Sequence, residues 1–315
     1  MKNLLILFLI AAAVVGCTKD ASHNRENTEV STESMVARSS TDAFEQYDPS
    51  TAEGAVALQR KMSCSLTDSE AVTFVWYGKG YSRVPGERDR HIFNLEGMNV
   101  RQCHTLNDPI RGEGYRHVSR ELMLYLDPIT NEALDKFENP WSGESNEVIH
   151  VANDPVNSRP TFGRAENGEI MPFKYRKIND AYLISYEVPL FYTNPLGGEY
   201  QKYVGGTYHA TEIFDFNGDL EELLDKSKSK AYPVVSWVRL AKWLPWMEMG
   251  DRPGLLYFNA MGRKLRDQDQ LSVALKSALA GQYSSYSEPP PIEDDRPNET
   301  SWTYMKKIID ARTKN

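Results

Sequence analysis

The sequence predicts a mainly β protein, either an antiparallel β-barrel or a closed sandwich with peripheral helices. Apolar and polar residues alternate through much of the middle of the chain, which is typical of half-buried strands. Asn-Pro and Asp-Pro pairs recur between the alternating stretches, and helix signals are confined to a few short segments. Together these observations favour antiparallel strands joined by short turns.

The predicted strands are stretches in which every second side chain is apolar. Such a pattern places the apolar side chains on one face of a strand and the polar ones on the other. The pattern is clearest in residues 71–78, 181–188 and 207–216, and further strands are predicted at 117–126, 234–240 and 255–261.

Turns are predicted where Asn or Asp precedes proline, because these side chains bond to the backbone that follows and proline fixes φ. Two turn segments are near-copies: DPITNE begins at Asp127 and NPWSGE begins at Asn139. Their separation of about 12 residues suits successive hairpins. No longer repeat accompanies them, so we interpret the similarity as repeated turn chemistry.

Three short helices are predicted at the periphery. DLEELLDK, from Asp219, has the acidic start and basic end that the helix dipole favours, and residues 267–281 form a longer helix that ends at glycine. Residues 301–312 form an amphipathic helix strapped over the strands, after an extended proline-rich stretch. We therefore expect one β domain over 44–281 and a separate C-terminal segment over 282–315.

The N-terminus predicts export and a lipid anchor. Residues 1–16 combine one lysine with an apolar run too short to cross a bilayer, as in a signal peptide. The sequence VVGC, ending at Cys17, resembles a bacterial lipobox, whose cysteine is acylated; the alternative is an ordinary signal peptide with a coincidental cysteine. Residues 17–43 are polar, which predicts a disordered tether. Because Thr18 stands where a retention signal has Asp, we expect attachment through Cys17 to the outer membrane, facing the periplasm.

The composition argues against some classes of partner, and it does not decide whether the cysteines are paired. With 36 Lys and Arg against 44 Asp and Glu, the formal net charge is −8, which argues against nucleic acid as a partner. Cys64 and Cys103 form either one disulfide or two separate buried thiols. No nucleotide-binding, zinc-protease or serine-hydrolase motif occurs, and the histidines of the body are scattered singly, so we expect no cofactor and no metal.

Charged residues on apolar strand faces are the first candidates for a site. Arg120, Glu212 and Arg239 each share a face with apolar side chains, and a buried charge requires a partner. We expect these three residues to form one internal cluster, in which Glu212 acts as an acid or base and the two arginines bind a ligand. A purely structural ion-pair network is the alternative. Glu121 falls on the opposite face of its strand from Arg120, so a regular strand cannot place both in one cavity.

A second candidate group surrounds the end of the strand-like segment VIHVA. His150, Asn153, Asp154 and Asn157 crowd into the stretch EVIHVANDPVN. Asn and Asp at such a position most often cap a turn through the backbone. The functional alternative is that His150 and Asp154 form an acid–base pair, with Asn153 and Asn157 beside a ligand.

The tryptophan-rich segment 236–254 is the third candidate. Its first part alternates as a strand, which places Trp237 and Arg239 together facing the interior. The proline inside its most apolar part disfavours a helix, so the remainder is predicted to be an extended or turning loop that closes over the mouth of a cavity. The residues of that loop assigned to binding are Trp243, Trp246 and Arg252. For at least one of the three tryptophans of the segment, the alternative is plain core packing.

Several segments in the same order resemble a bacterial family called domain of unknown function 1838. They are VSRELMLYLDPITNEAL, NPWSGESNEVIHVANDPVN, PLFYTNPLGGEY with YVGGTYHA, and WLPWMEMGDRPG, within about 44–265. The resemblance implies a calycin-like barrel, akin to lipocalins and carotenoid hydratase-like proteins, and it implies no established reaction. Through the matching motif VSRE it adds Glu121 to the candidate ligand-binding residues. Asn131 departs from the family's Thr-Gly-Glu turn, but asparagine also tolerates the left-handed conformation.

Three functional hypotheses follow. The leading one is a lipid-anchored periplasmic protein that binds a small, partly apolar molecule in an aromatic cavity gripped by Arg120 and Arg239. The first alternative is a lyase, hydratase or glycan-processing enzyme that uses Glu212, or His150 with Asp154, as its acid or base. The second is a structural or adaptor lipoprotein, which an exposed apolar patch without a concave pocket would favour.

Overall fold

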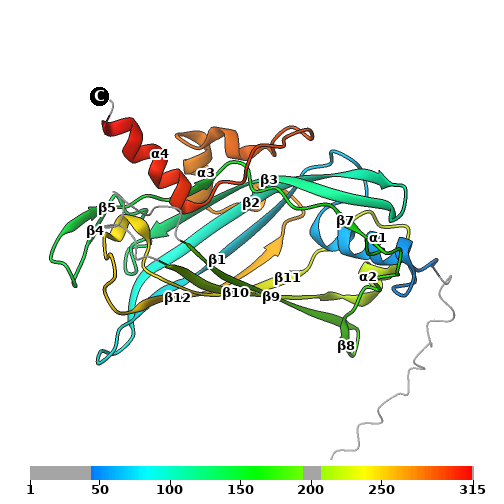
Figure 1. Cartoon of the computed structure of the whole chain (residues 1–315), viewed down its shortest axis with the longest axis horizontal. Coiled ribbons are helices and arrows are strands. Elements are labelled where there is room, and N and C mark those ends of the chain that lie inside the picture. Colours follow the sequence, from blue (N-terminus) through cyan, green and yellow to red (C-terminus); the bar gives the residue numbers. More distant parts are fainter. Residues whose placement is uncertain (1–43, 194–206, 314–315) are drawn as a thin grey trace, which may run out of the picture. The chain divides into compact units, whose positions relative to one another are not determined.

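The structure, a computed structural model, describes residues 44–193 and 207–313 (Figure 1). The predicted signal peptide, Cys17 and the tether lie outside the described residues. Phe44–Asn315 forms one compact unit, which includes the C-terminal segment. None of the helices in the described ranges is long and apolar enough to span a membrane.

Antiparallel strands are the main regular structure of this unit, and helices flank them. The strands are β1 (Val72–Arg83), β2 (Arg90–Asp108), β3 (Gly112–Leu126), β4 (Lys136–Glu138), β5 (Ser145–Glu147), β6 (Val151–Asn153), β7 (Thr161–Phe162), β8 (Arg176–Ile178), β9 (Ala181–Thr193), β10 (Thr207–Asp219), β11 (Val234–Ala241) and β12 (Leu255–Lys264). The helices are α1 (Ala52–Ser63), α2 (Leu220–Leu224), α3 (Val273–Ala280) and α4 (Ser301–Thr313), with 3-10 turns η2 (Pro245–Met247), η3 (Gln268–Gln270) and η4 (Ser284–Ser287).

The large sheet is antiparallel and open. Its strand order is β6-β3-β2-β1-β12-β11-β10-β9-β8, with β7 also paired to β3. Among the described residues no ladder joins β8 to β6 or β7, so the two ends of the sheet do not meet. The predicted mainly β, antiparallel fold is confirmed, whereas the barrel, calycin-like or otherwise, is wrong.

The sheet bends so that its two halves face each other. Side chains from β1, β2 and β3 and side chains from β10, β11 and β12 line the same cavity. This arrangement corresponds to the sandwich alternative, built from one curved sheet. In Figure 1, α1 and α2 lie together at one end of the sheet, whereas α3 and α4 pack against β2 and β6.

The two near-copied turns have the same hydrogen bonds. In the first, the Asp127 N–H donates to the Glu132 carbonyl at 2.8 Å, and the Asn131 N–H donates to the Asp127 carbonyl at 3.0 Å. The second repeats both bonds between Asn139 and Glu144 and between Gly143 and Asn139, and it joins β4 to β5. Positive φ angles of 62° at Asn131 and 78° at Gly143 explain why asparagine and glycine occupy this position.

The helices differ from prediction in two places. The helix predicted over 267–281 is split into η3 and α3, because the Ser272 hydroxyl accepts from the Leu275 N–H at 3.2 Å and starts a new helix there. Helix α1 has no counterpart among the predicted elements, although Thr51 caps its first turn and Arg60 and Lys61 lie in its last turn. Helix α2 begins after Asp219, as predicted.

Cys64 and Cys103 form a disulfide, with their Cα atoms 6.0 Å apart. Cys64 is the residue at the C-terminal end of α1, and Cys103 lies in β2. The bond therefore fastens α1 to the sheet. Of the two states that the sequence left open, the structure shows the oxidised one.

Both faces of β3 are buried, each against a different layer. The face with Leu122, Leu124 and Leu126 packs against Leu275 of α3 and against Tyr286 of the C-terminal segment. The other face contributes side chains to the cavity. The C-terminal segment is thus part of the core of the compact unit.

Candidate functional site

A cavity of about 270 Å³ lies between the two halves of the sheet. Its walls are mostly apolar and rich in aromatic rings, because strands of both halves turn large side chains inward. The aromatic lining residues are Phe74, Trp76, Tyr125, Tyr208, Phe214, Phe216, Trp237, Phe258 and Trp302. Two groups of polar side chains interrupt these walls.

The first polar group is centred on Glu212 and Arg239, which are direct cross-strand partners on β10 and β11. Arg239 Nη1 donates to Glu212 Oε1 at 2.7 Å, and Nη2 donates to the Tyr208 hydroxyl. Burial opposes the charge of Arg239, but attraction to Tyr208 and Glu212 outweighs burial and raises its pKa. The structure therefore brings together two of the three residues predicted to cluster.

Glu121 also belongs to this group. It faces the cavity from β3, and its cross-strand partner Asn153 on β6 hydrogen bonds to its carboxylate. Burial raises the pKa of Glu121 to about 7; the charge of Glu212 adds to this rise, and Arg239 opposes it. We call Glu121, Asn153, Tyr208, Glu212 and Arg239 the Glu212 cluster. Near neutral pH, Glu121 can either donate or accept a proton.

The second polar group surrounds Arg101 on β2. Arg101 Nε donates to Asn99 Oδ1 at 2.7 Å, and Asn99 Nδ2 donates to Ser119 Oγ at 3.3 Å. The guanidinium lies 4.8 Å from the centre of the Phe74 ring. Burial lowers the pKa of Arg101 to about 10, so it remains a cation at neutral pH. We call Asn99, Arg101, His117 and Ser119 the Arg101 cluster.

His117 is the uncharged member of the Arg101 cluster. Burial, followed by the charges of Arg101 and Arg116, holds its pKa well below the usual value of 6.5. Its imidazole is therefore neutral where Arg101 is charged, and it adds no second cation to this part of the cavity.

Arg120 lies outside the cavity, contrary to the prediction. The alternation of β3 turns it to the face opposite Glu121, and this face is covered by the C-terminal segment. Its Nη1 donates to the carbonyls of Ser285 and Glu288, at 2.8 and 2.9 Å, and its Nε lies 3.1 Å from Asp154 Oδ2. Arg120 thus holds the C-terminal segment in place.

His150 and Asp154 do not form the predicted acid–base pair. His150 Nδ1 accepts from the Tyr125 N–H at 3.1 Å, and burial lowers the pKa of the imidazole. Asp154 instead pairs with Arg120 and with Arg296, the latter at 2.7 Å. Neither His150 nor Asp154 lines the cavity. The Asp154 carboxylate points toward the two arginines instead.

The two asparagines of this stretch have different surroundings. Asn153 lines the cavity beside Glu121, as described above. Asn157 does not: its Oδ1 accepts from the Ser119 N–H at 3.1 Å, and its Nδ2 donates to the Asp294 carbonyl at 3.0 Å. Asn157 therefore joins β3 to the C-terminal segment.

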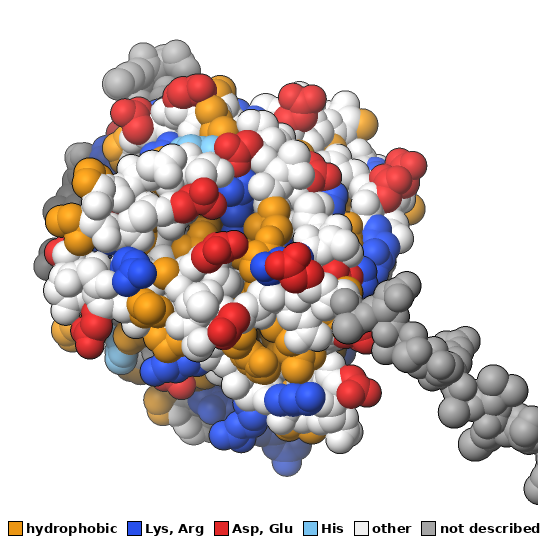
Figure 2. All heavy atoms as spheres, turned by 90° about the vertical axis from the view of Figure 1, so that its right-hand side faces the viewer, with side chains coloured by type: hydrophobic (Ala, Val, Ile, Leu, Met, Phe, Trp, Pro, Cys, Tyr) orange, Lys and Arg blue, Asp and Glu red, His pale blue; other side chains and the backbone are white. Residues whose placement is uncertain are grey.

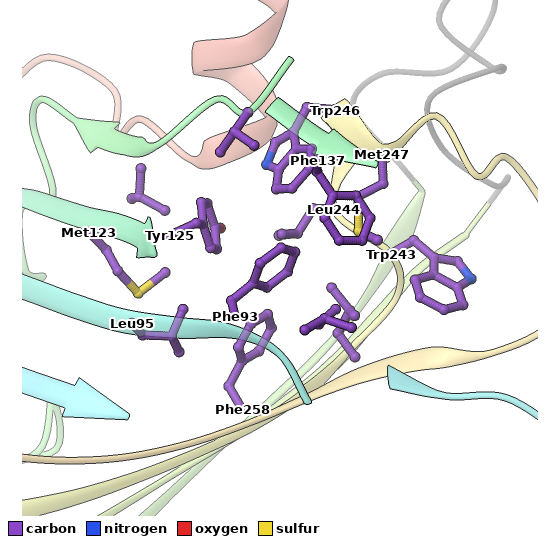
Figure 3. Packing of buried hydrophobic residues seen from close by; sticks show 14 of the residues in the cluster. Phe93, Leu95, Met123, Tyr125, Phe137, Trp243, Leu244, Trp246, Met247 and Phe258 are labelled. Atoms are coloured by element: carbon purple, nitrogen blue, oxygen red, sulfur yellow. The ribbon is translucent and has the colours of Figure 1, made fainter. Parts of the chain in front are cut away.

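The tryptophans of the segment 236–254 divide between cavity and core. Trp237 lines the cavity and stacks on Phe258, with ring centres 6.0 Å apart. Trp246 lies in the core instead, surrounded by the rings of Phe93, Tyr125 and Phe137 at 5.5–5.9 Å (Figure 3).

Trp243 is also a core residue, at the edge of the same cluster (Figure 3). Its indole N–H donates to the Arg252 carbonyl at 3.0 Å, while Arg252 itself is exposed. The predicted loop that closes a cavity mouth with Trp243, Trp246 and Arg252 is therefore wrong. These indoles pack in the core with apolar side chains of β4 and η2, among them Phe137 and Met247.

Sequence reasoning missed Arg101, Asn99, His117 and the role of Tyr208. In β2, Asn99 and Arg101 alternate with the buried Met98 and Val100, a pattern that predicts a solvent-facing polar side. Alternation separates the two faces of a strand, but it does not distinguish a polar face toward water from one toward a cavity. No signal in the sequence would have identified Arg101.

The described residues hold no metal-binding group of side chains, and the face drawn in Figure 2 carries charges of both signs. Over residues 44–193 and 207–313, no group of three or more His, Cys, Asp or Glu side chains could hold a metal ion. Figure 2 shows the face at the end of the sheet that carries α1 and α2, where acidic and basic side chains are interspersed. This face has no continuous basic patch of the kind that binds nucleic acid.

Comparison with known proteins identifies a family but no characterised relative. A family model described as "Protein of unknown function (DUF1838)" matches residues 69–309. No curated protein matches the chain. Two solved structures show weak similarity: the attachment invasion locus protein Ail of Yersinia pestis (5% identity, TM-score 0.15, covering 63% of this chain and 100% of that one) and a LolA superfamily protein of Nitrosomonas europaea (8%, 0.18, 69% and 94%). Both TM-scores are too low to indicate a shared fold.

Proposed function

The chain belongs to the DUF1838 family, described as proteins of unknown function, and we propose that it binds a small, partly apolar molecule in the cavity between the two halves of its sheet. The observation that carries this proposal is the combination of aromatic walls with two polar clusters deep inside the domain. A few convergent polar groups in an apolar pocket are typical of small-molecule sites. The volume, about 270 Å³, is near the small end of such sites.

Unpartnered polar atoms on the lining residues support the same proposal. Among the described residues, Trp237 Nε1 and Asn153 Oδ1 have no hydrogen-bond partner although both are buried. Buried polar groups are nearly always hydrogen-bonded, so each such atom calls for a physical reason. A ligand with both donor and acceptor groups would provide one. The cavity also makes a purely structural or adaptor role less favoured than binding.

A second candidate function is acid–base catalysis on the bound molecule, such as the elimination or hydration of a lyase or hydratase. It is favoured by Glu121, whose pKa of about 7 suits a residue that must both donate and accept a proton. Glu212 is the neighbouring carboxylate, held by Arg239. His150 and Asp154 have no part in this candidate, because neither lines the cavity.

The binding experiment uses the purified full-length chain and the neutral apolar dye N-phenyl-1-naphthylamine. Trp76, Trp237 and Trp302 line the cavity, so energy transfer from tryptophan to the dye reports binding. Ala241→Phe places a ring inside the cavity, and Ala241→Leu fills it less. Val234→Phe is the matched control, because Val234 lies on β11 but is 39% exposed.

We expect affinity for the dye to fall in the order wild type and Val234→Phe, then Ala241→Leu, then Ala241→Phe. Cooperative urea unfolding of each variant shows that it is folded. The proposal fails if the wild-type chain does not bind the dye, or if folded Ala241 variants bind it as tightly as Val234→Phe does.

We also propose that the protein acts in the bacterial cell envelope, attached through Cys17 to the outer membrane and facing the periplasm. The lipobox-like VVGC and the polar stretch 17–43 support this location. Cys17→Ser is expected to move the chain from the membrane fraction to the soluble fraction, as measured by immunoblotting. Retention of this variant in the membrane would contradict lipid attachment at Cys17.

A further inference from the structure

We propose that the cavity takes a monocarboxylic acid with a small apolar body, and that Arg101 binds its carboxylate. The inference rests on the proposed binding function, because it names the chemical class of ligand for the same cavity. It is carried by one half-buried arginine on the cavity wall, which has no ion-pair partner among the described residues.

Arg101 differs from the other arginines near the cavity in its partners. Arg239 pairs with Glu212 and Arg120 pairs with Asp154. Within the described residues, Arg101 makes one side-chain hydrogen bond, from Nε to Asn99, and takes part in no ion pair. The two terminal nitrogens, which form the fork that matches a carboxylate, have no partner among these residues.

A half-buried cation without an ion-pair partner has lost part of its hydration, so a compensating contact would stabilise it. The carboxylate that acts on Arg101 is Glu121, which attracts it without forming an ion pair. The aromatic ring of Phe74, below the guanidinium, lowers the cost only in part. A carboxylate from a ligand would accept hydrogen bonds from the two terminal nitrogens of Arg101.

The neighbouring charges favour a ligand with a single negative charge. Lys264 lies close enough for Arg101 to affect its pKa, but its ammonium group already donates to the carbonyls of Lys61, Cys64 and Ala231. His117 is neutral. Lys242 also lines the cavity without an ion pair among the described residues, but it follows the end of β11 and does not belong to the Arg101 cluster. Arg101 is therefore the one free cation of its cluster, which matches a single negative charge on the ligand.

The rest of the cavity suits an apolar body attached to that carboxylate. Phe74 and Trp76 on β1 and the stacked pair of Trp237 and Phe258 provide aromatic surface. Asn99 and Ser119 flank Arg101 with amide and hydroxyl groups. This arrangement matches a molecule with one charged end and an apolar remainder.

The test is competition between N-phenyl-1-naphthylamine and two probes of equal chain length, octanoate and 1-octanol, on the full-length chain at pH 7.5. We expect octanoate to displace the dye at lower concentration than octanol does. Arg101→Met should weaken octanoate binding by about ten- to hundredfold, the range for hydrogen bonds to a charged group, and leave octanol binding nearly unchanged. Arg101→Lys should recover part of the loss, because it restores the charge without the fork.

Arg263→Met is the matched control, because Arg263 lies on β12 and is exposed. If the dye binds but octanoate displaces it no better than octanol, or if Arg101→Met equals Arg263→Met, the carboxylate inference is wrong and the binding function stands. If the dye itself does not bind to the wild-type chain, the proposed function is wrong and the inference falls with it.

Discussion

At the scale of single residues, the cavity is defined by where neighbouring side chains on one strand point. Arg120 and Glu121 are adjacent in the sequence, yet one holds the C-terminal segment and the other faces the cavity. Their separation onto two faces followed from the sequence, because a strand alternates. The sequence did not show which of the two faces lines the cavity, because the second layer over β3 comes from residues far along the chain.

The raised pKa of Glu121 predicts how stability depends on pH. The ordinary pKa is 4.5, and burial raises it to about 7 in the folded chain. The stabilisation from this group is therefore complete below about pH 4.5 and is lost as the pH rises through 7, by about 3 kcal/mol in total. Glu121→Gln cannot ionise, so it should be more stable than wild type above pH 7, with the difference shrinking toward pH 5.

Urea unfolding of both chains between pH 5 and 8 measures this difference, in which the titration of all other groups cancels. Glu132→Gln, in an exposed turn, is the control and should follow the wild type at every pH. A constant difference between Glu121→Gln and wild type across this range would show that Glu121 is ionised throughout.

At the scale of elements, strands and turns were predictable because their signals are local. The repeated turn at Asn131 and Gly143 has the backbone that the sequence required, and the alternating segments are strands. The break before α3 was harder to predict, because Ser272 caps a new helix within a stretch whose pattern is otherwise helical. The cysteine pairing depends on a contact between α1 and β2, which local patterns do not contain.

The disulfide predicts a measurable share of stability. It closes a loop with a sequence separation of 39 residues, for which loop-closure entropy corresponds to about 2–4 kcal/mol. The double variant Cys64→Ala, Cys103→Ala should lose this amount in urea unfolding. Wild-type chain unfolded under reducing conditions should match the double variant. An equal stability of oxidised and reduced wild type would show that the bond contributes nothing.

At the scale of the whole molecule, the barrel prediction failed because the sequence of a single strand does not show whether the sheet closes on itself. Alternation and turn spacing are the same for a barrel and for a curved open sheet, and only the pairing of the end strands differs. The C-terminal segment supplies what the open sheet lacks: Trp302 of α4 contacts Tyr208 and lines the cavity, and Met305 enters the core.

This coverage predicts that α4 controls both stability and access to the cavity. Trp302→Ala should cost about 3–5 kcal/mol, as for other buried tryptophans, and should speed the entry of N-phenyl-1-naphthylamine measured by stopped flow. Arg312→Ala on the same helix removes only an exposed ion pair with Glu147, so it should cost less than about 1 kcal/mol. Equal behaviour of the two variants would show that α4 merely rests on the surface.

The strand order also has a consequence for how the chain is made. β1, near the beginning of the compact unit, pairs with β12, and the outer face of β3 is covered by η4 and α3, which are synthesised later still. A growing chain therefore exposes Leu122, Leu124 and Leu126 until nearly all of it has been translated. Folding must be a late event, dominated by contacts between distant parts of the sequence and correspondingly slow. Such a chain depends on being kept from aggregation until its last residues are available.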